Sequence, residues 1–447
     1  MKLFEFQGKE LFARAGIPVP ASRLVRVSEP DGSTVPGGME GVLERVEAAA
    51  AELGAAVPGL EKVVVKAQLD MGGRGKAGLI RVAEVAGPGG AGTVAAGASV
   101  AGTPTAGTVA REILGAGYTI PALLIEQAAD IRQELYLSIS AEPGSARYVV
   151  LASAEGGVDI EELARTRPEA IRRVHVDPFR GLQGYQSRGL AYDLGLTGTV
   201  AREFARLVER LHAVFTQYDG ELVEINPVFV CPTGDNPAGD GESLTLVAGD
   251  AKVIIDDNSL DRLQRAGHGE FTLTREQFDS DAAYESALEG IPYVQFDGDI
   301  SLMCAGAGLT TTVFDLVNYE GGAVANYLEF GGPNYNKARR AMELCLKNRS
   351  SVILIVTFGT IARADVMAEG VVAAMQALKP DRPIVTCIRG TNEEAADRTL
   401  REAGLEPLYD TEEAVRRAVA LAAAARGETA ADNGVARGDE TAREGRT

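Results

Sequence analysis

The apolar positions divide the chain into two halves with different rhythms. Short β-branched runs dominate the first half, at ALLIEQ (122–127), ELYLSIS (134–140), RYVVLAS (147–153), GELVEINPVFV (220–230) and LTLVAGDAKVII (244–255). The segments EELARTRPEAIRRV and VAREFARLVERLHAVF between these runs carry helical spacing. This pattern predicts an α+β half in which most strands are antiparallel.

The second half alternates strictly between strand and helix patterns. Apolar runs predict strands at 299–303, 323–330, 351–358 and 383–388. Periodic segments predict helices near 309–318, 336–347, 363–378, 393–403 and 411–425. Such β/α alternation predicts a flavodoxin-like, doubly wound parallel sheet.

The first ninety residues contain a helix and a glycine-rich hairpin. Residues 1–20 predict an amphipathic helix that ends at Gly16, and the following Ile17-Pro18-Val19-Pro20 forces an extended exit. Further on, KVVVKAQ, the glycine-rich MGGRGKAG and LIRVAEV predict two strands joined by an exposed, flexible tip.

Some segments are too poor in large apolar residues to fold. We expect a mobile insertion at 86–108, a similar stretch at 233–242 and a disordered tail at 426–447. The polar stretch 259–290 predicts a linker between two domains. The remaining parts predict one domain over 1–258 and another over 291–425.

Charge and composition exclude several classes of function. The chain of 447 residues has 44 Lys and Arg against 63 Asp and Glu, a net charge of −19, without any basic run. Nucleic acid and anionic membranes need a basic surface, so we expect neither as a partner. Four scattered cysteines, no signal peptide and no apolar stretch of about 18 residues favour a reduced cytoplasmic location.

One group of residues suits a nucleotide. A lysine neutralises phosphate charge, glycines let backbone N–H groups approach phosphates, and carboxylates at strand ends accept hydrogen bonds from ribose hydroxyls. The sequence places such residues at Lys66, Gly73, Arg74, Gly75, Glu126 and Glu134. A glycine-rich hairpin alone is equally typical of a surface turn.

A second group suits a hard cation. Glu224 and Asn226 alternate onto one face of a predicted strand, and Asp250 ends the neighbouring one. Three oxygen ligands on adjacent strands predict a Mg²⁺ site that bridges nucleotide phosphates. The alternative is that Asp250 and Lys252 are paired surface charges.

Together the motifs resemble one family. LFEFQGKELFARAGIPVP, KAQLDMGGRGKAG, IEQAADIRQELYLSIS, SAEGGVDIEE, HVDPFRGLQGYQ, EINP and DAKVIIDDN resemble, in order, the β subunits of succinyl-CoA synthetase. The resemblance covers about 1–258 and 297–425. It implies an ATP-grasp domain over 1–258, whose inner subdomain spans about 21–121, and a CoA-ligase domain over 291–425.

The resemblance also implies roles for individual residues. ATP is held by Lys66, Gly73, Arg74, Gly75, Glu126, Ala129 and Glu134. Mg²⁺ is ligated by Asn226 and Asp250, and Pro20 favours ATP over GTP. Glu224 is catalytic and faces a histidine that belongs to a partner α subunit.

The implied reaction is ATP + acid + CoA giving ADP, phosphate and acyl-CoA. The partner α-type subunit binds most of the CoA and carries the phosphorylated histidine, in an αβ heterodimer or an α2β2 heterotetramer. The helix that follows Gly306-Ala307-Gly308 is expected to stabilise phosphate at its N-terminus.

The acid site departs from the succinate pattern. Where succinate-using members carry Asn-Gly-Ala-Gly and Gly-Gly-Ile-Val-Arg, this chain has Ala305-Gly306-Ala307-Gly308 and Gly359-Thr360-Ile361-Ala362-Arg363. The second turn and Arg389 look closer to citryl-CoA synthetase and ATP-citrate lyase, since an arginine can clamp an additional carboxylate. Alternatively, Arg389 pairs with Glu393 or Glu394.

Several functions therefore stay open. Succinate is the default acid, with citrate and another dicarboxylate as alternatives, and the acid contacts are expected from Ala305, Gly359, Thr360, Ile361, Ala362 and Arg389. An ATP-grasp ligase that joins acid to amine, or a non-catalytic scaffold, would leave the second domain or the retained nucleotide residues unexplained.

Overall fold

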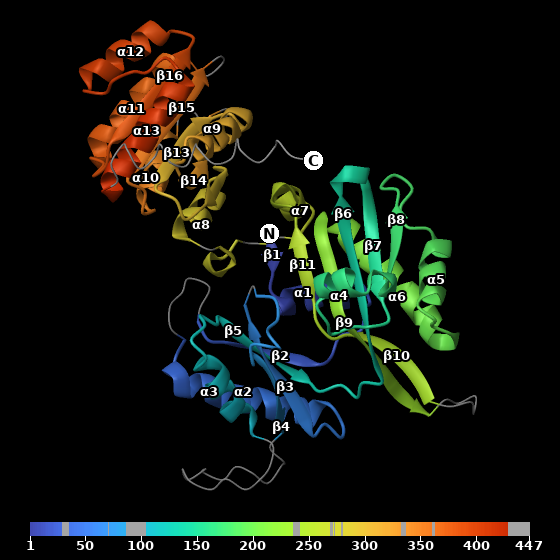
Figure 1. Cartoon of the computed structure of the whole chain (residues 1–447). Coiled ribbons are helices and arrows are strands. Elements are labelled where there is room, and N and C mark those ends of the chain that lie inside the picture. The colour runs from blue at the N-terminus through green and yellow to red at the C-terminus, as the bar shows by residue number, and fades with distance from the viewer. Residues whose placement is uncertain are drawn as a thin grey trace, which may run out of the picture. The chain divides into compact units, whose positions relative to one another are not determined.

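The computed structural model describes residues 1–28, 35–69, 71–85, 104–235, 242–268, 271, 273–278, 280–331, 337–359 and 363–427. The chain forms two compact units, Met1–Gln277 and Phe278–Thr447 (Figure 1). Several predicted features lie outside the described residues. They are the acid residues Thr360, Ile361 and Ala362, residues 86–103 of the predicted insertion, residues 236–241 of the similar stretch, and residues 428–447 of the predicted tail.

A four-stranded antiparallel sheet forms the first part of unit 1. Its order is β2-β5-β3-β4, and its strands are β2 (Ser22–Arg26), β3 (Lys62–Gln68), β4 (Ile80–Glu84) and β5 (Ala122–Gln127). Helices α2 (Gly38–Ala56) and α3 (Ala106–Leu114) pack on it through a core of valine, leucine and alanine side chains. The predicted hairpin is β3–β4, with Lys66 opposite Ile80.

A seven-stranded sheet forms the rest of unit 1. Its order is β1-β11-β9-β6-β7-β8, with β10 also paired to β9. The strands are β1 (Lys2–Leu3), β6 (Gln133–Glu142), β7 (Arg147–Ser153), β8 (Ile171–Val176), β9 (Gly220–Asp235), β10 (Glu242–Ala248) and β11 (Lys252–Ile255). Every pairing is antiparallel, as the alternating runs predict.

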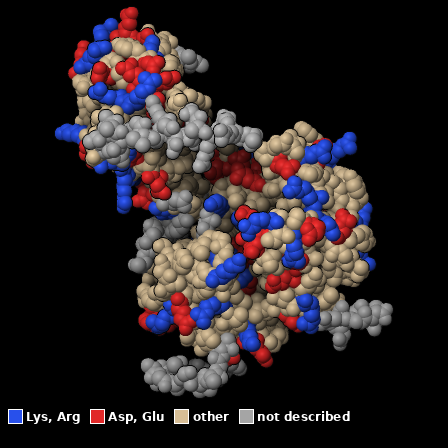
Figure 2. Space-filling view, in the orientation of Figure 1, with Lys and Arg blue, Asp and Glu red and all other residues tan. Residues whose placement is uncertain are grey.

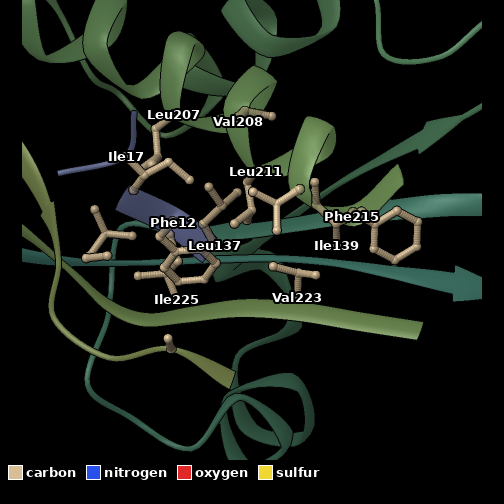
Figure 3. Close-up of a cluster of buried hydrophobic side chains, with 14 of the residues drawn as sticks. Phe12, Ile17, Leu137, Ile139, Leu207, Val208, Leu211, Phe215, Val223 and Ile225 are labelled. Carbon is tan, nitrogen blue, oxygen red and sulfur yellow. The ribbon is translucent and has the colours of Figure 1, made fainter. Parts of the chain in front are cut away.

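Helices α1 (Glu5–Arg14) and α6 (Gly198–Gln217) share the main core of this sheet. Figure 3 shows Phe12 of α1 and Ile17 among Leu137 of β6, Ile225 of β9 and Leu207 of α6. These apolar contacts fix α1 on the sheet. The smaller helices of the unit are α4 (Ile160–Thr166), α5 (Gly184–Asp193) and α7 (Leu260–Arg265).

Three local predictions were wrong. The run 244–255 is two strands, since Gly249-Asp250-Ala251 leaves the sheet between β10 and β11, which pair with different parts of β9. Residues 171–174 belong to strand β8 because Pro168 cannot continue helix α4 and the β-branched residues pair with β7. The predicted insertion 86–108 ends too late, since α3 begins at Ala106 with the Thr105 side chain as its N-cap.

Unit 2 is the predicted doubly wound domain. Its sheet has the order β12-β14-β13-β15-β16, with parallel pairing except for the edge strand β12. The strands are β12 (Tyr293–Gln295), β13 (Ile300–Ala305), β14 (Val324–Leu328), β15 (Val352–Gly359) and β16 (Ile384–Gly390). The helices are α8 (Asp281–Leu288), α9 (Ala307–Tyr319), α10 (Ala338–Leu346), α11 (Ala364–Leu378), α12 (Glu393–Glu402) and α13 (Thr411–Arg426).

Helices cover both faces of this sheet. One core contains residues of α10, α11 and α12, and the other contains residues of α9 and α13. Alternate residues of β15 enter the two cores, Ile353 and Ile355 on one side and Leu354 and Val356 on the other. Both faces of the strand are therefore apolar, which explains its continuous hydrophobic run.

Gly390 at the end of β16 offers a test of this packing. Its φ is 119°, and an added Cβ would lie 2.0 Å from the Gly359 carbonyl oxygen. Gly390→Ala should therefore lower the Tm of unit 2 by roughly 5–10 °C in thermal unfolding. Gly308→Ala, in α9 with nothing within 4 Å of the added Cβ, is the matched control. Equal Tm values for the two variants would contradict the strain at Gly390.

Candidate functional site

A cluster of buried charges lies where α1, β3, β5 and the break after β10 meet. Lys66 of β3 and Glu126 of β5 are 6% and 2% exposed, and Arg74 of the β3–β4 loop is 9% exposed. Asp250 lies in the break and keeps 29% of its side-chain exposure. Four of the predicted nucleotide and metal residues, far apart in sequence, are therefore neighbours.

Lys66 is held entirely by oxygen atoms. Its Nζ lies 2.8 Å from Glu5 Oε1, 2.6 Å from Glu126 Oε1 and 2.7 Å from the Gly249 carbonyl oxygen. The prediction that the tip of the hairpin is exposed is wrong for Arg74, because its side chain turns inward. Its Nη1 donates to Glu5 Oε2 at 2.8 Å, and its Nη2 contacts both oxygens of Asp250 at 2.9 and 3.0 Å.

Two residues of helix α1 complete the cluster. Glu5 accepts from Lys66, Arg74 and Gln68. Lys9 Nζ lies 2.9 Å from Glu5 Oε1, 2.5 Å from Glu126 Oε2 and 2.9 Å from the Gly249 carbonyl oxygen. The formal charges of the three cations and three carboxylates cancel, as buried charges require.

The ionisation of the cluster follows from these contacts. Burial opposes the charge of Glu5, but Lys66, Lys9 and Arg74 outweigh it and hold the pKa of Glu5 well below its ordinary value. Burial likewise opposes the charge of Lys66, and the carboxylates of Glu5 and Glu126 raise its pKa. Both groups are therefore charged at neutral pH.

The pKa of Asp250 is shifted in the opposite direction from that of Glu5. Burial and the nearby Glu5 carboxylate raise the pKa of Asp250, despite the opposing effects of Arg74 and Lys66. Glu224 is similar, because burial raises its pKa and Asp250 adds to the effect. Burial is the largest cause of both shifts, and a divalent cation would favour the ionised form of both carboxylates, so these oxygen donors fit Mg²⁺. Within the described ranges, no group of three or more His, Cys, Asp or Glu forms a ready metal cluster.

Asn226 of β9 and Glu134 of β6 both contact a loop that lies outside this cluster. The amide of Gly157 donates to Asn226 Oδ1 at 2.8 Å, and Asn226 Nδ2 donates to the Val158 carbonyl at 3.0 Å. An added Cβ at Gly157 would lie 2.2 Å from Glu134 Oε2. Asn226 and Glu134 thus both lie beside loop 156–158. Among the described residues, neither side chain directly contacts the cluster of Glu5, Lys9 and Lys66.

Glu224 lies on the same face of β9 as Asn226, as predicted from their alternation. The Tyr136 hydroxyl donates to Glu224 Oε2 at 2.9 Å and lies 2.9 Å from Ser138 Oγ. Lys252 of β11 is opposite Glu224 in the strand register. Glu224 is thus fixed by one hydrogen bond and one neighbouring cation.

The loop that carries Gly73 and Gly75 is open on its outer side. Gly73 has a φ of 70°, and an added Cβ at either glycine has nothing within 4 Å. Backbone N–H groups of such a loop are accessible to an anionic ligand. Ala129 lies half-buried in the connection between β5 and β6.

In unit 2, the predicted acid residues lie at the carboxyl edge of the sheet. Ala305 ends β13 and Gly359 ends β15, two adjacent parallel strands whose following helices α9 and α11 cover opposite faces. This is a topological switch point, where open α/β sheets bind ligands. An added Cβ at Gly331 would lie 2.7 Å from Ala305 Cβ, so backbone packs directly against Ala305.

Arg389 does not present a free guanidinium at this edge. Its Nε donates to Glu393 Oε2 at 2.9 Å, its Nη1 donates to the Tyr409 carbonyl, and the guanidinium lies 5.3 Å from the centroid of the Tyr409 ring. The alternative prediction of a pair with Glu393 is confirmed. Arg363, which precedes α11 and has a side chain 53% exposed, is paired with Asp365.

Comparisons with known proteins agree with this architecture. The family model for the ATP-grasp domain matches residues 2–230, and the model for the CoA-ligase domain matches residues 303–421. The ADP-forming sulfoacetate–CoA ligase subunit SauC of Bilophila wadsworthia is 48% identical over 423 residues, covering 95% of this chain and 99% of that protein.

This chain belongs to the ADP-forming acid–CoA ligase family.

Two further relatives show the range of the family. The sulfoacetate–CoA ligase subunit SqwK of an Acholeplasma species is 46% identical over 422 residues, covering 94% of this ligase and 92% of that protein. The β subunit of succinate–CoA ligase from Chloroflexus aurantiacus is 37% identical over 435 residues, covering 96% and 100%. The succinyl-CoA synthetase resemblance is thus confirmed at the family level.

A solved structure shares the fold. ATP citrate lyase from Methanothrix soehngenii, in complex with citrate and coenzyme A, has a TM-score of 0.63 and 18% identity, covering 94% of this chain and 99% of that chain. The ATP-grasp and CoA-ligase architecture predicted from the sequence is confirmed.

The surface of the ligase agrees with its composition. Figure 2 shows acidic and basic side chains interspersed over much of the visible face. Among the described helices, none is both long and apolar enough to cross a membrane.

The sequence interpretation missed Glu5, Lys9 and Gln68. Glu5 and Lys9 are spaced i,i+4 and lie on the face of α1 that also carries Gly8 and Phe12. The pattern of an amphipathic helix predicts that charged side chains face solvent, whereas Glu5 and Lys9 are each only 4% exposed. The available signal was the glycine between them, because Gly8 lets α1 approach Ala251, whose Cβ would lie 2.9 Å from a Cβ added at Gly8.

The depressed pKa of Glu5 predicts a pH dependence of stability. A carboxylate with a lowered folded-state pKa stabilises the protein fully above its unfolded-state pKa, and the effect is lost as pH falls through the folded-state pKa. Glu5→Gln should therefore lower Tm by an amount on the order of 5 °C, and this Tm difference should be constant between about pH 6 and 8. The difference between wild type and variant should become smaller as the pH falls further.

Thermal unfolding across pH measures this effect. Glu44→Gln, at an exposed position of α2, is the control and should leave Tm unchanged at every pH. A deficit for Glu5→Gln that widens as the pH falls would contradict the assigned direction.

Proposed function

We propose that the chain is the nucleotide-binding subunit of a ligase that joins sulfoacetate to CoA, with ATP converted to ADP and phosphate. The observation that carries this proposal is the 48% and 46% identity, over almost the whole chain, to two sulfoacetate–CoA ligase subunits, against 37% to a succinate–CoA ligase β subunit. The reaction is ATP + sulfoacetate + CoA giving sulfoacetyl-CoA, ADP and phosphate.

The acid site supports a sulfonate in place of the second carboxylate. A sulfonate is tetrahedral and accepts hydrogen bonds through three oxygens, so it needs more room than a planar carboxylate. Ala305 stands where succinate-using members carry asparagine, so this chain lacks the amide that those members would offer to a second carboxylate. Thr357, opposite Ala305 in the strand register, is fully buried, and its hydroxyl has no partner in the part of the chain that the structure describes.

Citrate receives less support. A tricarboxylate would need an additional cation, and the guanidinium of Arg389 is held by Glu393 and the Tyr409 carbonyl. The likeness to ATP citrate lyase at 18% identity concerns the fold alone.

The chemistry of the nucleotide site follows from charge. A carboxylate becomes an electrophile only after one of its oxygens joins a phosphoryl group, so the enzyme must move phosphate from ATP towards the acid. Lys66 and Arg74 offset phosphate charge, while the open glycine loop with Gly73 and Gly75 offers backbone N–H groups. Glu126, Ala129 and Glu134 hold the rest of the nucleotide.

The metal and the partner complete the proposal. Asn226 and Asp250 would hold Mg²⁺, which would supply positive charge to offset the charge of the phosphoryl group during transfer. Glu224 faces a histidine of an α-type partner subunit, which carries the phosphate onward and binds most of the CoA. The relatives are each named as one subunit of a ligase, which supports the need for that partner.

The acid is tested with the co-purified two-subunit complex. Acid-dependent ADP release should show a kcat/KM for sulfoacetate at least ~10-fold above that for succinate, with citrate lower still. Preference for succinate would remove sulfoacetate as the substrate. ADP release that depends on none of the three acids would contradict this class of substrate.

Asp250 is tested by its isosteric amide. Asp250→Asn should lower Mg²⁺-dependent phosphorylation of the partner's histidine about 100-fold, because a charged metal ligand is lost while the shape is retained. Phosphate transfer from labelled ATP measures this, and size-exclusion chromatography should show unchanged assembly. The control is Asp193→Asn, at an exposed position of α5. Phosphorylation at the wild-type rate would remove Asp250 from the site.

A further inference from the structure

We propose that Lys9 is a positioning residue of the nucleotide site, which retains the buried acceptors Glu5, Glu126 and the Gly249 carbonyl while Lys66 turns to the phosphates of ATP. This inference rests on the proposed function, because it takes ATP to be the ligand of Lys66.

The first step is the hydrogen-bond capacity of Lys66. An ammonium group has three N–H donors. Lys66 Nζ already has three oxygen neighbours, from Glu5, Glu126 and Gly249, all within 2.8 Å. A phosphate oxygen can therefore be bound by Lys66 only after at least one of these contacts is given up.

The second step is the duplication of those contacts. Lys9 Nζ contacts the same Glu5 Oε1, the other oxygen of Glu126 and the same Gly249 carbonyl, at 2.9, 2.5 and 2.9 Å. Two cations from α1 and β3 thus share one set of three acceptors. When Lys66 leaves, each acceptor keeps a cation.

The third step is the cost of the exchange without Lys9. The side chains of Glu5 and Glu126 are 1% and 2% exposed, and a buried carboxylate that loses its cations is strongly destabilising. With Lys9 in place, Glu126 keeps one ammonium and Glu5 keeps Lys9 and Arg74. The release of Lys66 therefore leaves no buried carboxylate unpaired.

The fourth step is which lysine moves. Lys9 belongs to α1, which Phe12 fixes in the main core and Gly8 brings close to Ala251 (Figure 3). Lys66 belongs to β3, which leads directly into the open glycine loop. Lys9 is thus the fixed cation and Lys66 the exchangeable one.

The test compares Lys9→Met with wild type in the two-subunit complex. The Kd for ATP–Mg from titration calorimetry should rise at least ~10-fold, since Lys66 is now the sole ammonium for the shared acceptors. KM values for the acid and CoA, measured at saturating ATP, should stay unchanged. Lys62→Met, at an exposed position of the same strand, is the control and should bind ATP as wild type does.

Two further variants separate positioning from other effects. Glu5→Gln/Lys9→Met removes one carboxylate with the ammonium, so its Kd should return to within ~3-fold of wild type. In the Lys66→Met background, the addition of Lys9→Met should change the Kd less than ~2-fold, because Lys9 acts through Lys66.

The outcomes are distinguishable. Wild-type ATP affinity in Lys9→Met, no recovery in the charge-balanced double variant, or additive losses with Lys66→Met would each overturn the role of Lys9. Failure of the wild-type complex to bind ATP–Mg would instead overturn the proposed function.

Discussion

The mutual neutralisation of five buried charged side chains and the partly exposed Asp250 is the constraint on which the nucleotide half of this ligase depends. Glu5, Lys9, Lys66, Arg74, Glu126 and Asp250 come from separate segments of the first 250 residues. Isolated charges cannot be buried at such depth, so each element must reach its place for the others to be stable there. The cluster therefore links the position of α1 to the positions of both sheets of unit 1.

The same cluster connects stability with chemistry. A cation that binds phosphate must be available to a ligand, whereas a buried cation must be paired. Pairing Lys66 and Arg74 with internal carboxylates satisfies the folded protein before ATP arrives, and the duplicated contacts of Lys9 let one of these pairs open at low cost. Asp250 is the most exposed carboxylate of the cluster, and burial raises its pKa.

The two units use different physics to present a ligand site. Unit 1 gathers charged side chains from antiparallel strands and one helix. Unit 2 relies on topology, because the chain reverses its winding between β13 and β15, which is where open α/β sheets bind ligands. The residues at this point, Ala305 and Gly359, are small, so backbone packing rather than long side chains shapes this edge of the sheet.

The sequence by itself determined the class of fold and singled out several charged residues that the structure brings together. The α+β first half, the β/α second half and the grouping of Lys66, Arg74 and Glu126 follow from local periodicity and motif spacing. Only the tertiary structure decided that Glu5 and Lys9 are buried, that Arg74 turns inward, that Asp250 lies in a break between two strands, and that Arg389 is held by Glu393. The reason is that periodicity reports which side chains prefer water, whereas a paired charge can be buried wherever distant elements supply its partner.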